Sequence, residues 1–458
     1  MKKWIGLFSL IVIVLVAYYV MGGMAKTTLT QNIESFPKSS VINLHLEQYR
    51  QGWFSSKAQL DLQMHIPAQK ITDKNGVVKM DTPLNLDISL PIRIKHGPFI
   101  WTDNGFRFGI AEVATRPETH YKALINYLRE TVIKYSLPSV TLKGNDGTVD
   151  GGVQINWEGL KTVLRVSSNL DTINANFNVY GLSGSASNVN FDFGQLEHDI
   201  QLWRHQEWLW VGQSHLGLAS AIINATEAQN FKLQGLDLQF NSDVNDNKME
   251  INCKLSLEKL LVDNQNYGPG IFKLSIKNLD PNVIAKLNQQ EANMVENNVD
   301  PNVAMLAIGA ELPKLLAKGP VVELAEMNLT LPEGQIKGNF KIWLPENEVN
   351  DSSQAMQKVR GEGHFKAPIR LVKSLMITSL KSDLAKKRQQ QPASITNPIA
   401  TFPAPAAANL DAEAEKQAER LIADLTNKGF LKVDGDNYIV DFTLDNQKLL
   451  INGNPWNI

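Results

Sequence analysis

The sequence predicts a β-dominated α+β fold that follows a single N-terminal transmembrane helix. Two observations support this prediction: a charge-free apolar run near the start of the chain, and an alternation of apolar and polar residues that recurs along the rest. The chain has 458 residues, whereas a single hydrophobic core stops growing at roughly 250–300 residues. We therefore expect one or more long, curved and antiparallel sheets with packed helices, rather than one compact core.

The composition is that of a folded protein without a strong overall charge. Hydrophobic residues make up 43% and charged residues 20% of the chain, which is enough to bury a core. The 45 Lys and Arg residues are balanced by 47 Asp and Glu residues. Because no net field draws the protein to a polyanion, we expect no nucleic-acid partner.

The transmembrane helix is predicted from an uncharged run between Trp4 and Met24, with Lys2 and Lys3 before it and Lys26 after it. As a helix this run is roughly 31 Å long, which matches the core of a bilayer. The two lysines before the run favour a cytoplasmic N-terminus, so that the bulk of the chain lies on the other side of the membrane.

Several residues of this run are the predicted membrane anchor: Trp4, Leu10, Val14, Tyr18 and Tyr19. The aromatic residues near the two ends suit the interfaces of a bilayer. A cleaved signal peptide is the alternative, because small residues flank Met24 where a signal peptidase would act. The run is longer than the roughly 7–15 apolar residues usual in such peptides, so we favour an anchor that is retained.

Strands are predicted wherever apolar residues recur at every second position. Between Leu60 and Ile66 apolar residues alternate with polar ones, which is typical of a strand with one buried face. A sheet with one wet face favours antiparallel pairing. In 231–240 the apolar phase slips at Gly235, which indicates a β-bulge. The same alternation occurs in 86–94, 173–179, 189–193, 336–344 and 438–444.

Four helices are predicted after the anchor. The first runs from Pro117 to Leu137, where apolar residues recur at helical spacing. Asp280-Pro281 and Asp300-Pro301 each place a capping carboxylate before a proline, which favours a helix start. Asp411 is expected to cap a last helix, which ends at Gly429 and precedes a C-terminal hairpin.

These segments divide the chain into five regions. A Pro- and Ala-rich stretch is typical of a linker and separates the last helix from the strands before it. The predicted regions are the anchor in 1–25, a β-rich region in 26–200, a β-rich region with helices in 201–388, the linker in 389–410, and the C-terminal helix and hairpin in 411–458.

Residues that could carry chemistry are few and scattered. Cys253 is the single cysteine, which excludes an intramolecular disulfide and a multi-cysteine zinc site, and we expect it to be a small buried hydrophobe. The eight histidines include no HExxH pair, and no phosphate-binding glycine loop is present. We therefore expect no catalytic residue, no metal site, no cofactor and no enzyme activity.

Two features keep a structural and a functional interpretation open. His96 precedes Gly97-Pro98 at the end of an alternating segment, so we expect it to bond turn backbone, with a catalytic base as the alternative. Trp203, Trp208 and Trp210 are predicted to pack across strands, the last two on one strand face. The alternative is an exposed aromatic patch that binds a lipid, a glycan or a partner chain.

Short motifs follow one another along the chain: Gly52-Trp53-Phe54-Ser55, His96-Gly97-Pro98, Gly268-Pro269-Gly270 and Asn452-Gly453. In their order and spacing they resemble the YdgA-like bacterial envelope proteins, a family of undefined function. The resemblance implies a Gram-negative inner-membrane protein that crosses the membrane once and has its bulk in the periplasm. It implies no known activity.

Three functions stay open at this point. The first is a non-catalytic envelope protein that is anchored in the lipid bilayer and acts as a scaffold or as an interaction surface for an envelope protein. The second is the binding or transfer of a lipid along an apolar groove of the sheet. The third is an enzyme of a type that sequence motifs do not reveal. The edge strands of a long sheet also favour a homo-oligomer.

Overall fold

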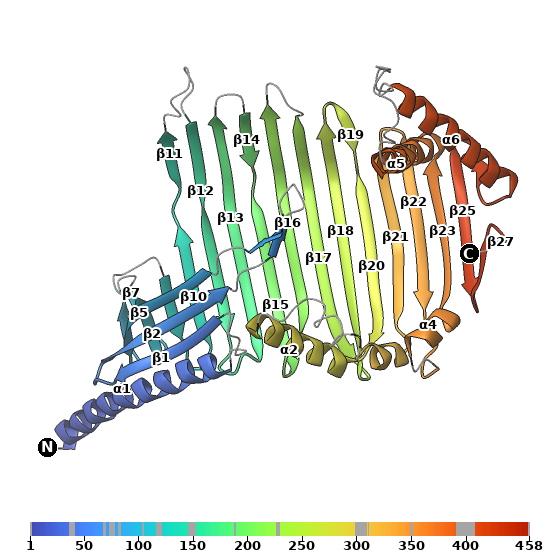
Figure 1. Cartoon of the computed structure of the whole chain (residues 1–458). Helices are drawn as coiled ribbons and strands as arrows, with labels where there is room; N and C mark the ends of the chain where they lie inside the picture. Colours follow the sequence, from blue (N-terminus) through green and yellow to red (C-terminus); the bar gives the residue numbers. More distant parts are fainter. Residues whose placement is uncertain are drawn as a thin grey trace. The chain divides into compact units, whose positions relative to one another are not determined.

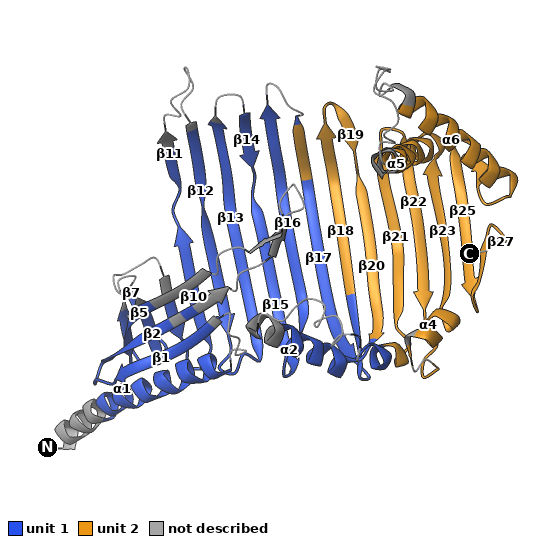
Figure 2. Ribbon diagram, in the orientation of Figure 1, with its two compact units in different colours: residues 1–230, 235–251, 279–315 blue, residues 231–234, 252–278, 316–458 orange. Residues whose placement is uncertain are grey.

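Antiparallel strands make up most of the protein (Figure 1). The computed structural model describes residues 2–35, 42–66, 70–72, 78–80, 84–102, 105–115, 121–144, 153–186, 189–225, 230–297, 309, 311–348, 351–390 and 408–456. The predicted β-dominated α+β fold, with a large antiparallel curved sheet and an apolar N-terminal helix, is confirmed. The chain forms two compact units (Figure 2): unit 1 comprises 1–230, 235–251 and 279–315, and unit 2 comprises 231–234, 252–278 and 316–458.

Unit 1 begins with α1 (Lys2–Glu34), a helix that is long and apolar enough to cross a membrane. The helix continues well beyond the predicted anchor, and its second half belongs to the hydrophobic core. Ala25 and Thr28 are fully buried, and Met21 and Met24 pack against buried side chains of the sheet. The predicted anchor segment therefore continues as the same helix into the core of unit 1, without a linker.

The strands of unit 1 form a meander in which most strands pair antiparallel with the next strand along the chain. Two positions in the sheet are each occupied by two short strands in succession. Strand β11 follows β10 and also pairs with β12, and β14 lies in line with β15 and also pairs with β13 and β16. Two small hairpins, β3–β4 and β6–β7, stand apart from the large sheet. The bounds are β1 (Ile42–Arg50), β2 (Ser55–Ile66), β3 (Lys70–Thr72), β4 (Val78–Met80), β5 (Leu84–His96), β6 (Ile100–Thr102), β7 (Gly105–Arg107), β8 (Ala111–Thr115), β9 (Tyr121–Ile125), β10 (Thr131–Leu137), β11 (Val140–Gly144), β12 (Val153–Val166), β13 (Thr172–Ala186), β14 (Val189–Phe193), β15 (Leu196–Gln206) and β16 (Leu209–Ala225).

The predicted helix between Pro117 and Leu137 is wrong. The described part of this segment is the hairpin β9–β10, closed by a turn at 126–130. The apolar residues fit a helical spacing, but they also fit two short strands. The β-branched residues of 131–133 favour a strand, and pairing with β8 and β12 on either side decides the outcome.

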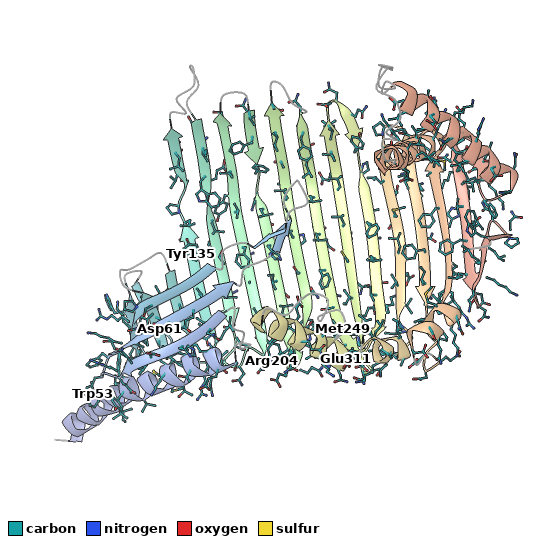
Figure 3. The ribbon with its side chains drawn as sticks, in the orientation of Figure 1. Trp53, Asp61, Tyr135, Arg204, Met249 and Glu311 are labelled. Carbon is teal, nitrogen blue, oxygen red and sulfur yellow. The ribbon has the colours of Figure 1, made fainter. Side chains whose placement is uncertain are left out.

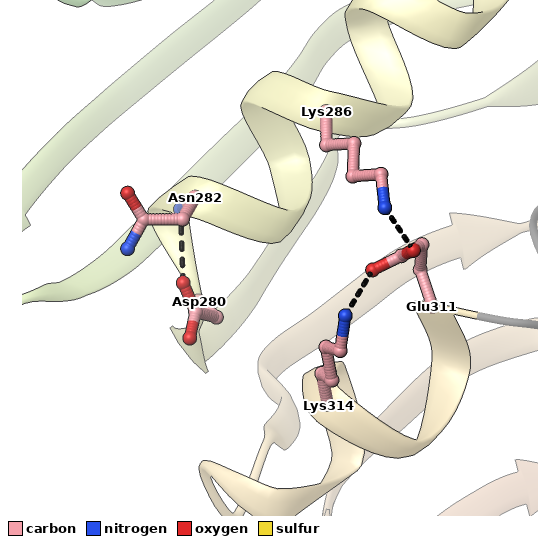
Figure 4. A network of polar contacts seen from close by, with 5 residues as sticks. All are labelled: Asp280, Asn282, Lys286, Glu311 and Lys314. Carbon is pink, nitrogen blue, oxygen red and sulfur yellow. Dashed lines mark hydrogen bonds and ion pairs between the residues drawn. The ribbon is translucent and has the colours of Figure 1, made fainter.

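Helix α2 (Pro281–Asn297) confirms the first of the two predicted Asp-Pro starts, because Asp280 Oδ1 accepts a hydrogen bond from the Asn282 amide at 2.9 Å. Glu311, on the helical segment 311–317, accepts bonds from Lys286 of α2 at 2.5 Å and from Lys314 at 3.2 Å (Figure 4). The two ammonium groups hold the pKa of this carboxyl, which is only 7% exposed, below its usual value. The second predicted start, at Asp300-Pro301, lies outside the described residues.

Unit 2 repeats the antiparallel pattern of unit 1. The strands β20–β21–β22–β23–β25–β26–β27 pair in this order, and β24 pairs with β25. The bounds are β19 (Gln265–Tyr267), β20 (Gly270–Leu279), β21 (Val321–Leu331), β22 (Gly334–Trp343), α4 (Ser352–Lys358), β23 (Arg360–Pro368), α5 (Ile369–Gln390), α6 (Ala408–Asn427), β24 (Lys432–Asp434), β25 (Asn437–Asp445), β26 (Lys448–Ile451) and β27 (Asn454–Trp456). Two strands, β17 (Phe231–Asn245) and β18 (Lys248–Val262), contain residues of both units.

The predicted C-terminal helix and hairpin are confirmed by α6, β25 and β26. Helix α6 begins at Ala408, so Asp411 lies in its first turn rather than at its cap. It packs against α5, where Lys373 binds Glu419 at 2.8 Å and Glu415 at 3.2 Å. Most of the predicted linker lies outside the described residues, apart from the end of α5 and the start of α6.

Asn452 secures the end of this hairpin. It has a φ of +51° and is buried, and its side-chain amide donates to the carbonyls of Phe430 and Ile439 while its oxygen accepts from the Asp441 amide. Three backbone groups thus depend on one side chain.

Replacement of Asn452 by alanine should destabilise unit 2, because it leaves these three backbone groups unpaired. The matched control is Asn446→Ala, since Asn446 has a similar φ of +47° in the exposed β25–β26 turn. We expect Asn452→Ala to cost about 2 kcal/mol more than Asn446→Ala. Hydrogen exchange of the β25 amides in urea measures the difference, and equal effects of the two variants would contradict this role.

Candidate functional site

Several side-chain hydrogen bonds join α1 to the sheet at the end of β5. His96, at the end of β5, is 1% exposed, and its Nδ1 lies 2.9 Å from the carbonyl oxygen of Tyr18. Its Nε2 lies 2.9 Å from Oγ of Ser56, which is fully buried on β2. Because a carbonyl only accepts, Nδ1 carries the proton and Nε2 accepts from the serine in the neutral ring.

The ring of His96 thus bonds the anchor helix rather than the turn backbone that the sequence predicts. Burial holds its pKa below the ordinary 6.5, against the opposing effect of the bond to Tyr18. Further bonds join the same stretch of α1 to the sheet: Tyr18 donates to Phe99 O at 2.7 Å, Gln51 to Tyr19 O at 2.7 Å, and Tyr49 to Gly22 O at 2.8 Å.

Two glycines allow this close approach. A Cβ on Gly22 would lie 2.7 Å from Cε1 of His96, whereas one on Gly23 would meet only Gln51, at 4.0 Å. A Cβ on Gly97 would lie 2.1 Å from the ring of Tyr18, and Gly97 has a φ of +138°. Gly22 thus has a packing role within one chain.

One face of the sheet, here called the α1 face, continues from this junction across unit 1. Ile94, which is fully buried beneath α1, starts a series of directly paired residues, one from each successive strand. Paired residues in antiparallel strands point to the same side, so the series lies on one face. Its members are Ile94, Val113, Ala123, Ile133, Leu164, Ala175, Ile200 and Ser214.

Beyond Ile94, most residues of this series are partly exposed. Helix α1 packs against β1, β5 and β8, and α2 packs against β16. On β13, between the parts of the sheet that these two helices contact, Ala175 is buried, whereas Phe177 on the same face is 38% exposed. The single-layer sheet of β12, β13 and β15 therefore presents apolar side chains that no described helix covers (Figure 3).

On the opposite face of unit 1, residues of β8, β9, β10 and β12 line a cavity of about 700 Å³ with charged as well as apolar side chains. Lys134 and Arg165 lie on this face because their strand neighbours Ile133 and Leu164 lie on the α1 face. More basic than acidic residues line the cavity: Arg107, Lys134, Lys161 and Arg165 against Glu112 and Glu130. The two faces of unit 1 thus differ strongly in polarity.

The motif residues in the second half of the chain have structural roles in turns and backbone hydrogen bonds. Gly268, with a φ of +97°, forms a cis bond to Pro269, and the pair bonds Thr330 of β21 through Gly268 N and Pro269 O. Gly270 begins β20. Gly453 follows Asn452 with a φ of +84°. All of these residues belong to unit 2, whereas His96 belongs to unit 1.

The three tryptophans do not form one patch. Trp208 lies in the β15–β16 turn with a φ of +65°, so the predicted strand face shared with Trp210 is wrong. The tight hairpin requires a left-handed residue at this position, which removes Trp208 from the alternation. Trp210 lies on the α1 face, under the Arg204 guanidinium, and Trp203 on the opposite face.

Among the described residues, no group of three or more His, Cys, Asp or Glu side chains could hold a metal ion. Cys253 is only partly buried on β18. Two cross-strand pairs were not predicted from the sequence: His215 with Asp237, and His364 with Asp441 at 2.6 Å. Their partners are 22 and 77 residues apart, so only strand pairing could have revealed them.

The predicted anchor residues belong to α1. Tyr18 contacts Phe54 with ring centroids 5.1 Å apart, and Tyr19 contacts Trp53 at 5.3 Å. The motif Gly52-Trp53-Phe54-Ser55 therefore forms the turn that meets the anchor. Val14 is partly exposed, and the side chains of Trp4 and Leu10 lie outside the described residues.

A family match runs over residues 1–458 and is to a bacterial protein family of unknown function, DUF945. The chain belongs to the DUF945 family. This match is consistent with the narrower resemblance to YdgA-like envelope proteins. No curated protein and no solved structure matches this DUF945 protein.

Replacement of Gly22 by alanine should destabilise unit 1, although alanine favours a helix. The new methyl group would enter the space of the His96 ring, which cannot move without losing both of its bonds, at a cost of about 1–3 kcal/mol. Gly23→Ala is the control and should be neutral or stabilise the helix by up to about 1 kcal/mol. Thermal unfolding of the full chain in micelles measures both effects, and equal behaviour of the two variants would contradict a steric role of Gly22.

Acidification should destabilise the protein through His96. Between the lowered pKa in the folded state and 6.5, the unfolded state binds more protons, so stability falls as pH falls through this window. His96→Gln should remove part of this pH dependence, while His45→Gln, at an exposed position on β1, should retain it. Urea unfolding between about pH 7.5 and pH 5.5 measures both slopes. Parallel slopes for His96→Gln and the wild type would exclude the histidine as their cause.

Proposed function

We propose that this DUF945 protein is a non-catalytic envelope protein that is anchored in the inner membrane by α1 and binds lipid acyl chains on the α1 face. Its N-terminus is cytoplasmic and its bulk periplasmic. The observation that carries the proposal is the continuity of this face, from the core beneath the anchor helix to the exposed Phe177.

The structure supports an anchor that is retained. Cleavage near Ala25 would remove Met21, Met24 and Ala25 from the core and would break the bonds of His96 and Tyr49 to the helix. The dependence of the unit 1 core on this segment supports an anchor over a cleaved signal peptide. The two lysines before the helix favour the proposed orientation.

The exposed part of the α1 face favours lipid over a protein partner. Its aromatic and aliphatic side chains offer dispersion contacts without a cross-strand pattern of charges, which lies on the opposite face instead. For acyl chains, a face that begins at a membrane helix gives a continuous apolar route from the bilayer. The scaffold function is the competing outcome.

A photo-crosslinking residue, p-benzoylphenylalanine, at Phe177 should capture phospholipid in intact cells. The same residue at Asn176, the neighbour on the opposite face of β13, is the matched control and should capture little. Mass spectrometry of the purified full chain identifies the adducts. A protein adduct at Phe177 would support the scaffold instead, and equal lipid capture at both positions would refute binding to a defined face.

A further inference from the structure

A group of exposed aromatic and aliphatic side chains lies beside α1 at the junction and is here called the aromatic collar. A surface with so many large apolar groups is unusual for a protein face that meets water. Leu128 is 87% and Trp101 is 76% exposed. The collar consists of Trp53, Phe54, Phe99, Trp101, Phe106, Phe108, Tyr127 and Leu128.

The collar is contiguous and is attached to the anchor. Phe106 contacts Phe99, Trp101 and Phe108, with ring centroids 5.3–6.1 Å apart. Tyr18 of α1 joins this group to Phe54, because its hydroxyl donates to Phe99 O while its ring packs on Phe54. Figure 3 shows Trp53 beside the N-terminal half of α1.

The tip at Leu128 is held in an ordered turn. Asn126 Oδ1 accepts from the amides of Leu128 at 2.9 Å and Glu130 at 3.0 Å, and its Nδ2 donates to the Glu130 carboxylate at 2.8 Å. Tyr127 donates to Pro98 O at 2.6 Å, which ties this turn to the loop that bears Phe99. The turn thus keeps an apolar side chain extended into the surroundings.

The collar lies where the lipid-exposed part of α1 ends. Before Gly22, the first buried residue of the helix, the apolar side chains of Val16, Tyr19 and Val20 are exposed. The uncharged residues from Trp4 to Met21 number 18, or about 27 Å of helix, which is near the lower limit for crossing a bilayer core. The rings that contact Tyr18 and Tyr19 therefore meet the membrane interface.

We infer that the aromatic collar inserts into the interfacial region of the bilayer, so that unit 1 is seated on the membrane and not only tethered to it. Trp, Tyr, Phe and Leu side chains partition into this region. Exposed Arg129 follows Leu128 in the same turn and suits anionic lipid headgroups. This inference depends on the proposed membrane anchor but is independent of lipid binding on the α1 face.

The test uses the full chain with Cys253→Ser, so that each variant carries one cysteine for an environment-sensitive NBD label. The collar variants are Trp101→Cys and Leu128→Cys. The controls are Leu142→Cys, which is exposed on β11 away from α1 in unit 1, and Ile13→Cys in the anchor. Each protein is reconstituted in vesicles of phosphatidylethanolamine and phosphatidylglycerol that contain nitroxide lipids.

Headgroup nitroxide should quench the label at 101 and 128 several-fold more than at 142, while a mid-chain nitroxide should quench most strongly at 13. If the label at position 13 is quenched but the labels at 101 and 128 are quenched no more than the label at 142, insertion of the collar is refuted and the membrane anchor is retained. Absence of mid-chain quenching at 13 would overturn both. Protection of 101 and 128 from aqueous iodide without lipid quenching would point to a second copy of the chain and would also refute insertion.

Discussion

The contact between the anchor helix and the end of β5 is the constraint on which unit 1 depends. The His96 imidazole bonds Tyr18 of the helix with one nitrogen and Ser56 of the sheet with the other. This arrangement requires a glycine on each side, because a side chain at Gly22 or Gly97 would occupy the space of a ring. A buried neutral imidazole with both nitrogens satisfied avoids the cost of an unpaired polar group, and it fixes the helix at one register and one depth.

A single layer of antiparallel strands explains how so long a chain folds without one large core. Each strand pairs with its neighbours, and the two faces divide the apolar and the charged side chains between them. In unit 2 the apolar face carries Phe365 and Phe442, with stacked rings 6.4 Å apart, while the other carries ion pairs such as Lys277 with Glu323. Stability is therefore distributed along the ladder, and one face is left apolar wherever no helix lies on it.

Period-two alternation identified seven strands, β2, β5, β13, β14, β17, β22 and β25, and the Asp-Pro start identified α2, because both are local properties. The hairpin β9–β10 was mistaken for a helix, since short strands and a helix can share the same spacing of apolar residues. The strand β1 was not predicted, although Ile42, Leu44 and Leu46 alternate with polar residues. At the site, the position of His96 at a strand end was predictable, but its partners were not. Ser56 lies 40 residues away and the Tyr18 carbonyl 78 residues away in sequence, and only the packing of α1 on the sheet brings them together.

The continuity of α1 from the half that we propose to span the membrane into the core also has a mechanical consequence. A flexible linker would let the folded part reorient freely above the bilayer. A helix whose second half is buried instead fixes the orientation of unit 1 relative to the segment in the membrane. The tilt of this helix in the bilayer depends on how well its apolar length matches the thickness of the surrounding hydrocarbon core. A thicker or thinner membrane would therefore change the orientation of unit 1 relative to the membrane plane. This change would alter the distance between its strands and the lipid surface.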